Sequence, residues 1–263
     1  MPQLSPLFPT RITGLFLLTL SLSSFPASLD WQSALSDFEK RYPQLGELDT
    51  PELPSARGES HYHGNRNREQ RRVALTFDAC SRWTGNRKDA RVLSILKENE
   101  IQATLFLGGR WMIENPELTR RWAENPDLEI GTHGYRHPRL TELSAEDQML
   151  EISYAQAAAL AITGHWPRYF RPPFAEYNQD TLSIAAKLGL ELIQFDVASG
   201  DADPDQSPEA VAEHVLDNIR PGSIVVLHLH QEALPTAEAL PLILEGLAER
   251  DLDPVTIPTL LGS

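Results

Sequence analysis

The sequence predicts an α/β protein whose parallel β-sheet forms a barrel or part of one. Three observations support this fold class. From residue 72 onward, short apolar runs typical of strands alternate with longer segments that have helical periodicity. The short runs are continuously apolar, as expected for parallel strands that helices cover on their faces. With 263 residues, of which 41% are apolar, the chain is long enough for one large domain with a full core.

Seven short apolar runs are predicted to be strands. They lie at residues 73–77, 103–107, 128–130, 169–170, 190–195, 223–227 and 254–257. Each run is followed or preceded by a segment with helical spacing, which is the order of a βαβ protein. We therefore expect about seven parallel strands with intervening helices and no internal repeat.

Helices are predicted between these strands, and several of their starts carry capping signals. They lie at residues 90–97, 116–124, 144–162 and 179–188, from 207–208 onward, and at 236–249. Ser144 begins a pattern that resembles a capping box, and Asn178 is placed to cap the next helix. Ser207 followed by Pro208 is typical of a helix start, because proline is tolerated in the first turn.

The amino-terminal part lies outside this alternation. Residues 1–28 are predicted to be an export signal, with Arg11 before the apolar run 12–25 and small residues after it. That run is shorter than the about 20 residues that span a bilayer, so we expect no stable transmembrane anchor. The chain is thus expected to be exported, either periplasmic or secreted. Residues 29–70 are predicted to be a linker or wrapping arm before a domain at 71–263.

The charge and the cysteine content restrict the possible partners. The formal net charge is −14, an excess of acidic residues, whereas phosphate recognition relies on Lys and Arg. This argues against a nucleic-acid partner and is compatible with a neutral or cationic substrate. Cys80 is the single cysteine, so no intrachain disulfide can form and the core must hold the fold. The sequence does not indicate an oligomeric state.

Polar residues able to bind metals or transfer protons follow the predicted strands. They are Asp78 after the first strand, His133 and His137 after the third, Arg171 after the fourth, Asp196 and Asp201 after the fifth, and His228 after the sixth. The carboxyl ends of barrel strands share one face, so these side chains are expected at one site. His133 and His137 are four residues apart on one turn and can reach the same ion.

Five ordered motifs resemble those of the polysaccharide deacetylase family, the carbohydrate esterase group that shares the NodB homology domain. They are TFDAC at 76–80, HGYRHP at 133–138, RPPF at 171–174, DVASGD at 196–201 and LH at 227–228. The resemblance covers about residues 72–258. It implies a deformed (β/α) barrel and the metal-dependent removal of N-acetyl groups from a glycan such as peptidoglycan, a chitin-like polymer or another envelope polysaccharide.

The resemblance also implies roles for individual residues. His133 and His137 would be metal ligands, Asp78 the general base, Arg171 its orienting partner, His228 the general acid, Asp196 or Asp201 the support of that histidine, Phe174 an oxyanion donor through its amide, and Pro173 and Tyr135 neighbours of the substrate. The chemistry requires the same residue types. An amide carbonyl is a poor electrophile, so hydrolysis needs a cation that polarises it, a carboxylate that takes a proton from water, and an acid for the leaving amine.

The first motif departs from the family at the metal site. The family has a second aspartate after the general base as a metal ligand, and here that position is Ala79. A water molecule, the Cys80 thiolate or Asp89 are the three candidate replacements. The expected ion is divalent, with zinc preferred over cobalt, nickel or manganese, and a thiolate ligand would strengthen that preference.

Two classes of function remain open from the sequence. The fourth motif has Ala198 and Ala202 where the family has an aspartate and a tryptophan, which indicates a divergent branch. The first class is an exported metal-dependent amide hydrolase. The second is a catalytically weak or inactive sugar-binding or scaffold protein on the same fold. Retention of Asp78, Arg171 and His228 together favours the enzyme, because a binding protein would not need all three.

Overall fold

The computed structural model describes residues 31–49, 52–53, 56, 58–67, 69–80, 90–229 and 234–262. The predicted export signal at residues 1–28 lies outside this part of the chain. The strands are β1 (Ser60–His61), β2 (Arg72–Ala79), β3 (Ala103–Leu107), β4 (Leu128–Thr132), β5 (Tyr169–Phe170), β6 (Glu191–Ile193), β7 (Val197–Ala198), β8 (Ile224–His228) and β9 (Asp253–Pro254). The helices are α1 (Trp31–Arg41), α2 (Ala90–Glu98), α3 (Gly109–Glu114), α4 (Pro116–Ala123), α5 (Ala145–Thr163), α6 (Gln179–Lys187), α7 (Pro208–Asn218), α8 (Thr236–Glu249) and α9 (Ile257–Leu261). Short 3-10 turns occur at Pro43–Leu45, Leu140–Glu142 and Pro173–Ala175.

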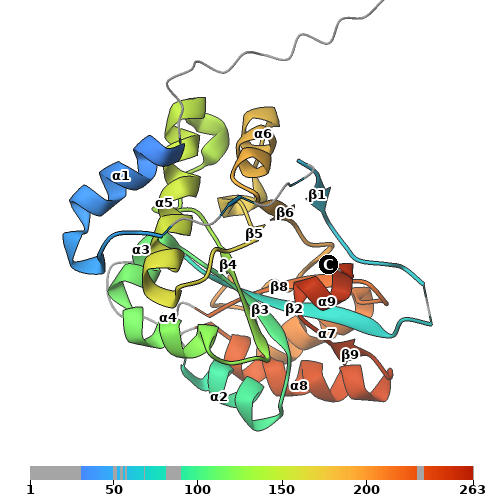
Figure 1. The fold of residues 1–263 in the computed structure, drawn as a ribbon. Coiled ribbons are helices and arrows are strands. Elements are labelled where there is room, and N and C mark those ends of the chain that lie inside the picture. The colour runs from blue at the N-terminus through green and yellow to red at the C-terminus, as the bar shows by residue number, and fades with distance from the viewer. Residues whose placement is uncertain are drawn as a thin grey trace, which may run out of the picture.

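The strands form one curled parallel sheet that helices surround (Figure 1). The order of the strands is β1-β6-β5-β4-β3-β2-β8-β7, and β9 pairs with β2. All of these pairings are parallel, so the carboxyl ends of the strands point to one edge of the sheet. The predicted deformed (β/α) barrel is confirmed.

The central strands are almost entirely buried, which explains their continuous apolar runs. In β2 every residue after Arg72 is buried, and all five residues of β3 are buried. Helices pack on both sides of these strands, so neither face can be polar. Helices α5 and α8 pack on the face that Val73, Leu75 and Phe77 share, whereas α9 packs on the face of Ala74 and Phe106.

The capping signals in the sequence mark helix starts in the structure. The Ser144 side chain accepts a hydrogen bond from the Asp147 amide at the start of α5, and Ser207 caps α7 in the same way. Asn178 and Thr181 form a reciprocal capping box at the start of α6. Each cap satisfies backbone N–H groups that have no partner inside the helix.

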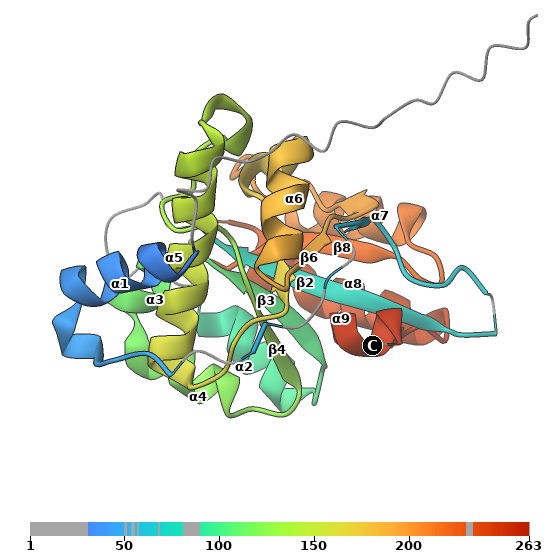
Figure 2. The same cartoon turned by 45° about the horizontal axis from the view of Figure 1, so that its top comes forward.

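Residues of the predicted linker or arm pack against the domain. Helix α1 lies along α5, where Phe38 is 1% exposed and its ring meets Tyr154 with 5.5 Å between centroids (Figure 2). Strand β1 adds to the edge of the sheet beside β6. Those residues of the arm that the structure describes therefore pack around the domain. Among all the residues that the structure describes, no helix is both long enough and apolar enough to span a membrane.

Some elements were not predicted because they are short or atypical. Strands β1 and β7 have two residues each, too few for a periodic pattern to show. Helix α3 has six residues and begins at a glycine. The last predicted strand, 254–257, is reduced to β9, and the chain then turns into α9 at Ile257.

Candidate active site

The strand register brings the predicted site residues to the same edge of the sheet. Asp78 near the end of β2 pairs directly with His228 at the end of β8. Thr132 pairs with Phe170, so the residues that follow them, His133 and Arg171, emerge side by side from β4 and β5. The parallel register thus gathers residues that are about 150 positions apart in sequence.

His133 and His137 converge through their Nε2 atoms, which lie 3.1 Å apart. The Nδ1–H of His133 donates to the carbonyl of Arg171 at 2.8 Å, so its Nε2 is the nitrogen left for a ligand. A backbone carbonyl behind a histidine is the usual arrangement for a metal ligand, because it sets the tautomer and the ring orientation. Burial lowers the pKa of His133 despite the opposing effect of Asp78, which favours the neutral, ligating form.

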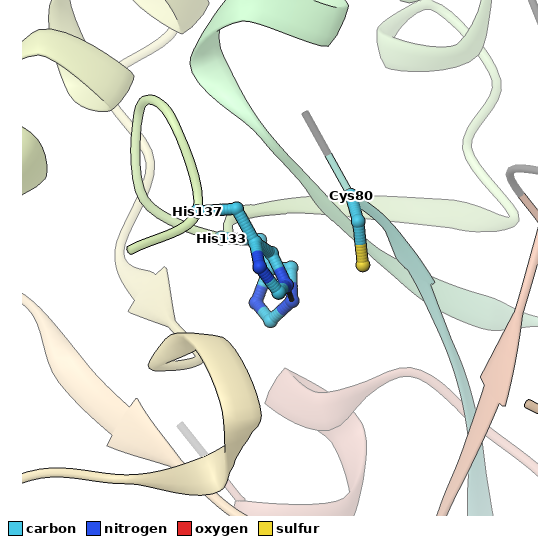
Figure 3. Close-up of side chains that lie close together, drawn as sticks. All are labelled: Cys80, His133 and His137. Atoms are coloured by element: carbon cyan, nitrogen blue, oxygen red, sulfur yellow. Dashed lines mark hydrogen bonds between the residues drawn. The ribbon is translucent and has the colours of Figure 1, made fainter. Parts of the chain in front are cut away.

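Cys80 completes a compact group of potential metal ligands. The donor atoms of Cys80, His133 and His137 all lie within 4.8 Å of one another, and all three residues are buried. Figure 3 shows the two imidazole rings together, with the Cys80 side chain projecting beside them from the end of β2. One thiolate and two imidazoles are a ligand set that zinc accepts in proteins, with a position left open. The residues present therefore fit a zinc ion.

Of the candidates for the third ligand, only Cys80 is a side chain that the structure describes. Asp89 lies outside the described residues. Ala79 is fully buried in the main hydrophobic cluster, whereas Cys80 follows it and reaches the histidines. Side chains alternate along a strand, so the residue two positions after Asp78 returns to the same face.

Asp78 and Arg171 form a buried ion pair beside the histidines. Nη1 of Arg171 donates to Oδ1 of Asp78 at 2.8 Å, and the other carboxylate oxygen lies 3.7 Å from Nε2 of His133. Burial alone would raise the pKa of Asp78, but the charge and hydrogen bond of Arg171, together with the charge of His228, outweigh it and the pKa is lowered. The carboxylate is therefore ionised and able to accept a proton.

The partners that hold Arg171 were not predicted from the sequence. The side chain is 1% exposed, and its guanidinium donates to Thr76 Oγ1 at 2.8 Å and to the Gln194 carbonyl at 3.2 Å. Its guanidinium carbon lies 4.2 Å from the centre of the Phe106 ring. Thr76 is in β2, Phe106 is in β3 and Gln194 follows β6. They come together only in the folded sheet, so the local sequence around each does not indicate the contact. They compensate for the burial of a permanent charge.

His228 is oriented by Asp201 in a second ion pair. Nδ1 of His228 lies 2.8 Å from Oδ1 of Asp201, whose carboxylate also accepts hydrogen bonds from the His228 amide and the hydroxyls of Ser199 and Thr236. Burial would lower the pKa of His228, but the hydrogen bond and charge of Asp201 dominate and raise it. The same contacts lower the pKa of Asp201 against the effect of its burial. Nε2 of His228 is thereby the nitrogen available for proton transfer.

Asp196 is a correction to the expected site. Its carboxylate accepts hydrogen bonds from the Ile224 amide at 2.8 Å and from the Ser223 hydroxyl at 3.0 Å, and it pairs with Arg66. Ile224 is the first residue of β8, so Asp196 lies at the end of that strand opposite His228. The chain enters β7 directly after Asp196, which places this residue at an amino end instead of a carboxyl end.

The loop that carries the histidines has an unusual backbone, and so does the turn beside it. His137 has φ 69°, and Phe174 and Ala175 both have φ 58°, the left-handed region that side chains with a Cβ rarely adopt. Such conformations persist where the surrounding structure enforces them, and they are common at functional sites. Glu151 of α5 is one such constraint, because its carboxylate accepts hydrogen bonds from the amides of Tyr135 and Arg136.

The residues expected near a substrate separate into two groups. The Phe174 ring is 36% exposed and packs edge-on against His137, with 4.7 Å between ring centres. Pro173 before it is buried against Gly134. Tyr135 is a correction, because its side chain is 3% exposed and its ring packs against Tyr154 in the core. The sequence could not show which side of the loop this ring would face.

Comparisons with known proteins agree with this geometry. The sequence matches the polysaccharide deacetylase family over residues 65–193. It is 31% identical over 228 residues to a peptidoglycan N-acetylglucosamine deacetylase of Listeria monocytogenes, covering 86% of this chain and 44% of that protein. The chain thus spans less than half the length of this relative.

Among the solved structures with a similar fold are two proteins of carbohydrate esterase family 4. One is a family 4 carbohydrate esterase from Streptomyces lividans in complex with acetate, with a TM-score of 0.61 and 32% identity over 69% of this chain and 90% of that chain. The other is a carbohydrate esterase family 4 pseudoenzyme from Bacillus anthracis, with a TM-score of 0.69 and 26% identity over 86% of this chain and 80% of that chain.

Proposed function

Because this chain belongs to the polysaccharide deacetylase family, we propose that it is an exported, metal-dependent hydrolase that removes N-acetyl groups from an N-acetylhexosamine glycan of the cell envelope. Peptidoglycan is the favoured substrate, since the Listeria relative is a peptidoglycan deacetylase. The observation that carries the proposal is the joint placement of two ion pairs, Asp78–Arg171 and Asp201–His228, around one group of metal ligands.

The proposed cofactor is zinc, held by Cys80, His133 and His137. Thiolate sulfur selects zinc over manganese, whereas two imidazoles alone would accept several divalent ions. When bound, zinc would supply a Lewis acid that polarises the amide carbonyl and acidifies water. Cys80, His133 and His137 are all buried. The low dielectric constant around them strengthens electrostatic interactions at the site.

The proposed proton transfers use the two ion pairs. Asp78 takes a proton from the attacking water while Arg171 holds the carboxylate in place and ionised. The hydroxide oxygen bonds to the carbonyl carbon, and the amide N–H of Phe174 stabilises the negative oxygen that develops. The C–N bond then breaks, and Nε2 of His228 delivers its proton to the leaving amine. The products are acetate and a free amino sugar.

A second candidate is a sugar-binding protein without catalytic activity. Ala79 in place of the family's aspartate favours this alternative, and the Bacillus anthracis structure shows that the family includes a pseudoenzyme. The chain retains the proposed base Asp78 with its partner Arg171 and the proposed acid His228 with its partner Asp201, which favours the enzyme. A binding protein would gain nothing from a buried Asp78–Arg171 pair, because burying two charges is costly.

Acetate release distinguishes these candidates. We expect the zinc-loaded protein to release acetate from peptidoglycan or from N-acetylglucosamine oligomers, and Asp78→Asn to reduce the rate on the order of 10²-fold or more. Leu242→Ala, a change at an exposed position on α8, is the matched control and should keep the wild-type rate. Binding of these glycans by the wild type without any acetate release would favour the sugar-binding protein.

A further inference from the structure

Exposed aromatic side chains gather at the edge of the candidate active site. Among the described residues, the large hydrophobic side chains with substantial exposure are Tyr62, Leu150, Phe174 and Leu242. Leu150 and Leu242 are on the helices α5 and α8, whereas Phe174 contacts the metal-ligand candidate His137. Tyr62 is 46% exposed and comes from the arm that precedes the domain.

The strand register places Tyr62 at the same level as the site. Ser60 of β1 pairs with Leu192 of β6, Leu192 pairs with Phe170 of β5, and Phe170 pairs with Thr132 of β4. His133 and Arg171 are one residue beyond this line, and Tyr62 is two residues beyond it. Because all four strands are parallel, Tyr62 lies at the carboxyl edge where the site is built.

Tyr177 joins the arm to the loop that carries Phe174. The hydroxyl of Tyr177 lies 2.9 Å from the hydroxyl of Tyr62 and 3.0 Å from Oγ of Ser60. Tyr177 is half-buried against the second core cluster, so its ring has a stable backing. Phe174 and Tyr177 are three residues apart, which separates their Cα atoms by at most about 10 Å.

Two further residues, Gln194 and Arg139, hold this surface in place. The Gln194 amide donates to the carbonyl of His61, and its side chain donates to the carbonyl of Ala175, both within 2.9 Å. Gln194 thus connects the arm with the turn after Phe174. On the other side, the Arg139 guanidinium lies 4.4 Å from the centre of the Phe174 ring and pairs with Glu176. The aromatic rings are therefore preorganised, which reduces the entropy lost on binding.

We propose that Phe174, Tyr177 and Tyr62 form an aromatic platform that binds the sugar units next to the one being deacetylated. The proposal deepens the proposed function, on which it rests. Sugar rings present an apolar C–H face and a polar edge, and tyrosine offers an apolar ring with a polar hydroxyl to match them. The arm would then determine how strongly the protein prefers long glycans over short ones.

The test compares a long with a short N-acetylglucosamine oligomer. For the hexamer relative to the dimer, the ratio of the kcat/KM values should fall about fivefold to tenfold in Tyr62→Ala, as expected when an aromatic contact is removed from a binding surface. The loss should appear in KM for the hexamer. Tyr62→Phe retains the ring and should keep most of the ratio. Leu150→Ala, exposed on α5, is the matched control and should leave the ratio at its wild-type value.

Calorimetric binding of the hexamer to Asp78→Asn provides a measurement that does not need turnover. Adding Tyr62→Ala or Tyr177→Ala to this variant should weaken binding by the same factor. If the hexamer binds equally with and without Tyr62, and the kcat/KM ratio is also unchanged, the platform does not exist. If the wild type releases no acetate but these tyrosine changes still weaken hexamer binding, the proposed hydrolase is wrong while the platform stands.

Discussion

Cys80 is the residue that we propose as the replacement for the ligand that the family has at position 79. It lies two positions after Asp78, and its sulfur lies within 4.8 Å of a ring nitrogen of His133 and of His137. The family's carboxylate position is occupied by Ala79, which is part of the hydrophobic core. As a ligand, the Cys80 thiolate would contribute a negative charge as a carboxylate does, so the proposed site would retain its net charge and would favour zinc.

A substitution of Cys80 tests this ligand. Cys80→Ser should weaken zinc binding at least about 100-fold, since even residues behind a ligand contribute up to that factor. Cys80→Asp should retain more affinity and lose part of the preference for zinc over manganese. Competition with a chelator, measured for each metal, gives both values. Equal zinc affinity in the wild type and in Cys80→Ser would exclude the thiolate as a ligand.

The pair of Asp201 and His228 predicts a pH dependence. Asp201 and Asp78 raise the pKa of His228, while burial and Arg171 lower it, and the net pKa is above the ordinary value of 6.5. His228 must be protonated to act as the acid, so activity should fall only as the pH rises through this raised pKa. Asp201→Asn removes the main cause and should move the alkaline limb of the kcat profile to lower pH.

Asp196→Asn is the control for this experiment, because Asp196 lies at the other end of β8 and should leave the limb in place. The ion pair of Asp201 and His228 also makes the free energy of unfolding depend on pH. A pKa raised in the folded state stabilises the protein fully below pH 6.5 and loses this contribution as the pH rises through the folded value. An alkaline limb that Asp201→Asn leaves unmoved would show that Asp201 does not set the pKa of His228.

The sequence predicted the residues at the strand ends and an aspartate that supports His228, but it missed the further partners that hold Arg171 and Asp201. Asp78, Arg171 and His228 could be predicted because each adjoins a recognisable apolar strand. Ser199 and Thr236 approach Asp201 from a loop and from the start of α8, and nothing in their local sequence indicates this contact. The orientation of a side chain in a loop, as for Tyr135, depends on tertiary packing that a single sequence does not encode locally.

At the scale of elements, α5 supports the loop that contains both histidines. The helix is buried along most of its length because α1, α3, α4, α6 and β4 all contact it. Its residue Glu151 is 7% exposed, and the carboxylate accepts hydrogen bonds from two successive loop amides. Burial raises the pKa of Glu151 despite these hydrogen bonds.

Glu151→Gln tests whether this helix positions the ligands. A neutral amide accepts weaker hydrogen bonds from the two loop amides, so the loop should be held less firmly. Zinc affinity should fall about 10-fold to 100-fold, as for other groups that orient metal ligands. Glu146→Gln, an exposed change at the start of the same helix, is the control. Unchanged zinc affinity in Glu151→Gln would show that the loop keeps its shape without this carboxylate.

Long elements were predicted more accurately than short ones. Helices α5 and α8 and strands β2 and β3 have enough residues for their periodicity or apolar character to define them. Strand β7 has two residues, and its existence depends on pairing with β8. Because β7 was not predicted, Asp196 was expected at the carboxyl end of the strand before it. In the structure it precedes β7 and therefore lies at the amino end of the sheet.

At the scale of the whole molecule, the curled parallel sheet relates the parts of the site. Asp78, His133, Arg171 and His228 come from four strands, and the register of those strands places them side by side. The arm contributes α1 behind α5 and β1 at the sheet edge, so it both buries core residues and extends the candidate substrate surface. The net charge of −14 is compatible with a neutral or amino-bearing glycan.

The metal content of the purified chain is the most direct measurement of the central claim, that the edge of the sheet holds a catalytic zinc ion. Elemental analysis should find about one zinc ion per chain in the wild type, as expected for a single site with three protein ligands. His133→Ala should lose the ion while circular dichroism shows that the barrel remains folded. Wild-type protein that binds no divalent metal, or His133→Ala protein with wild-type metal content, would contradict the claim.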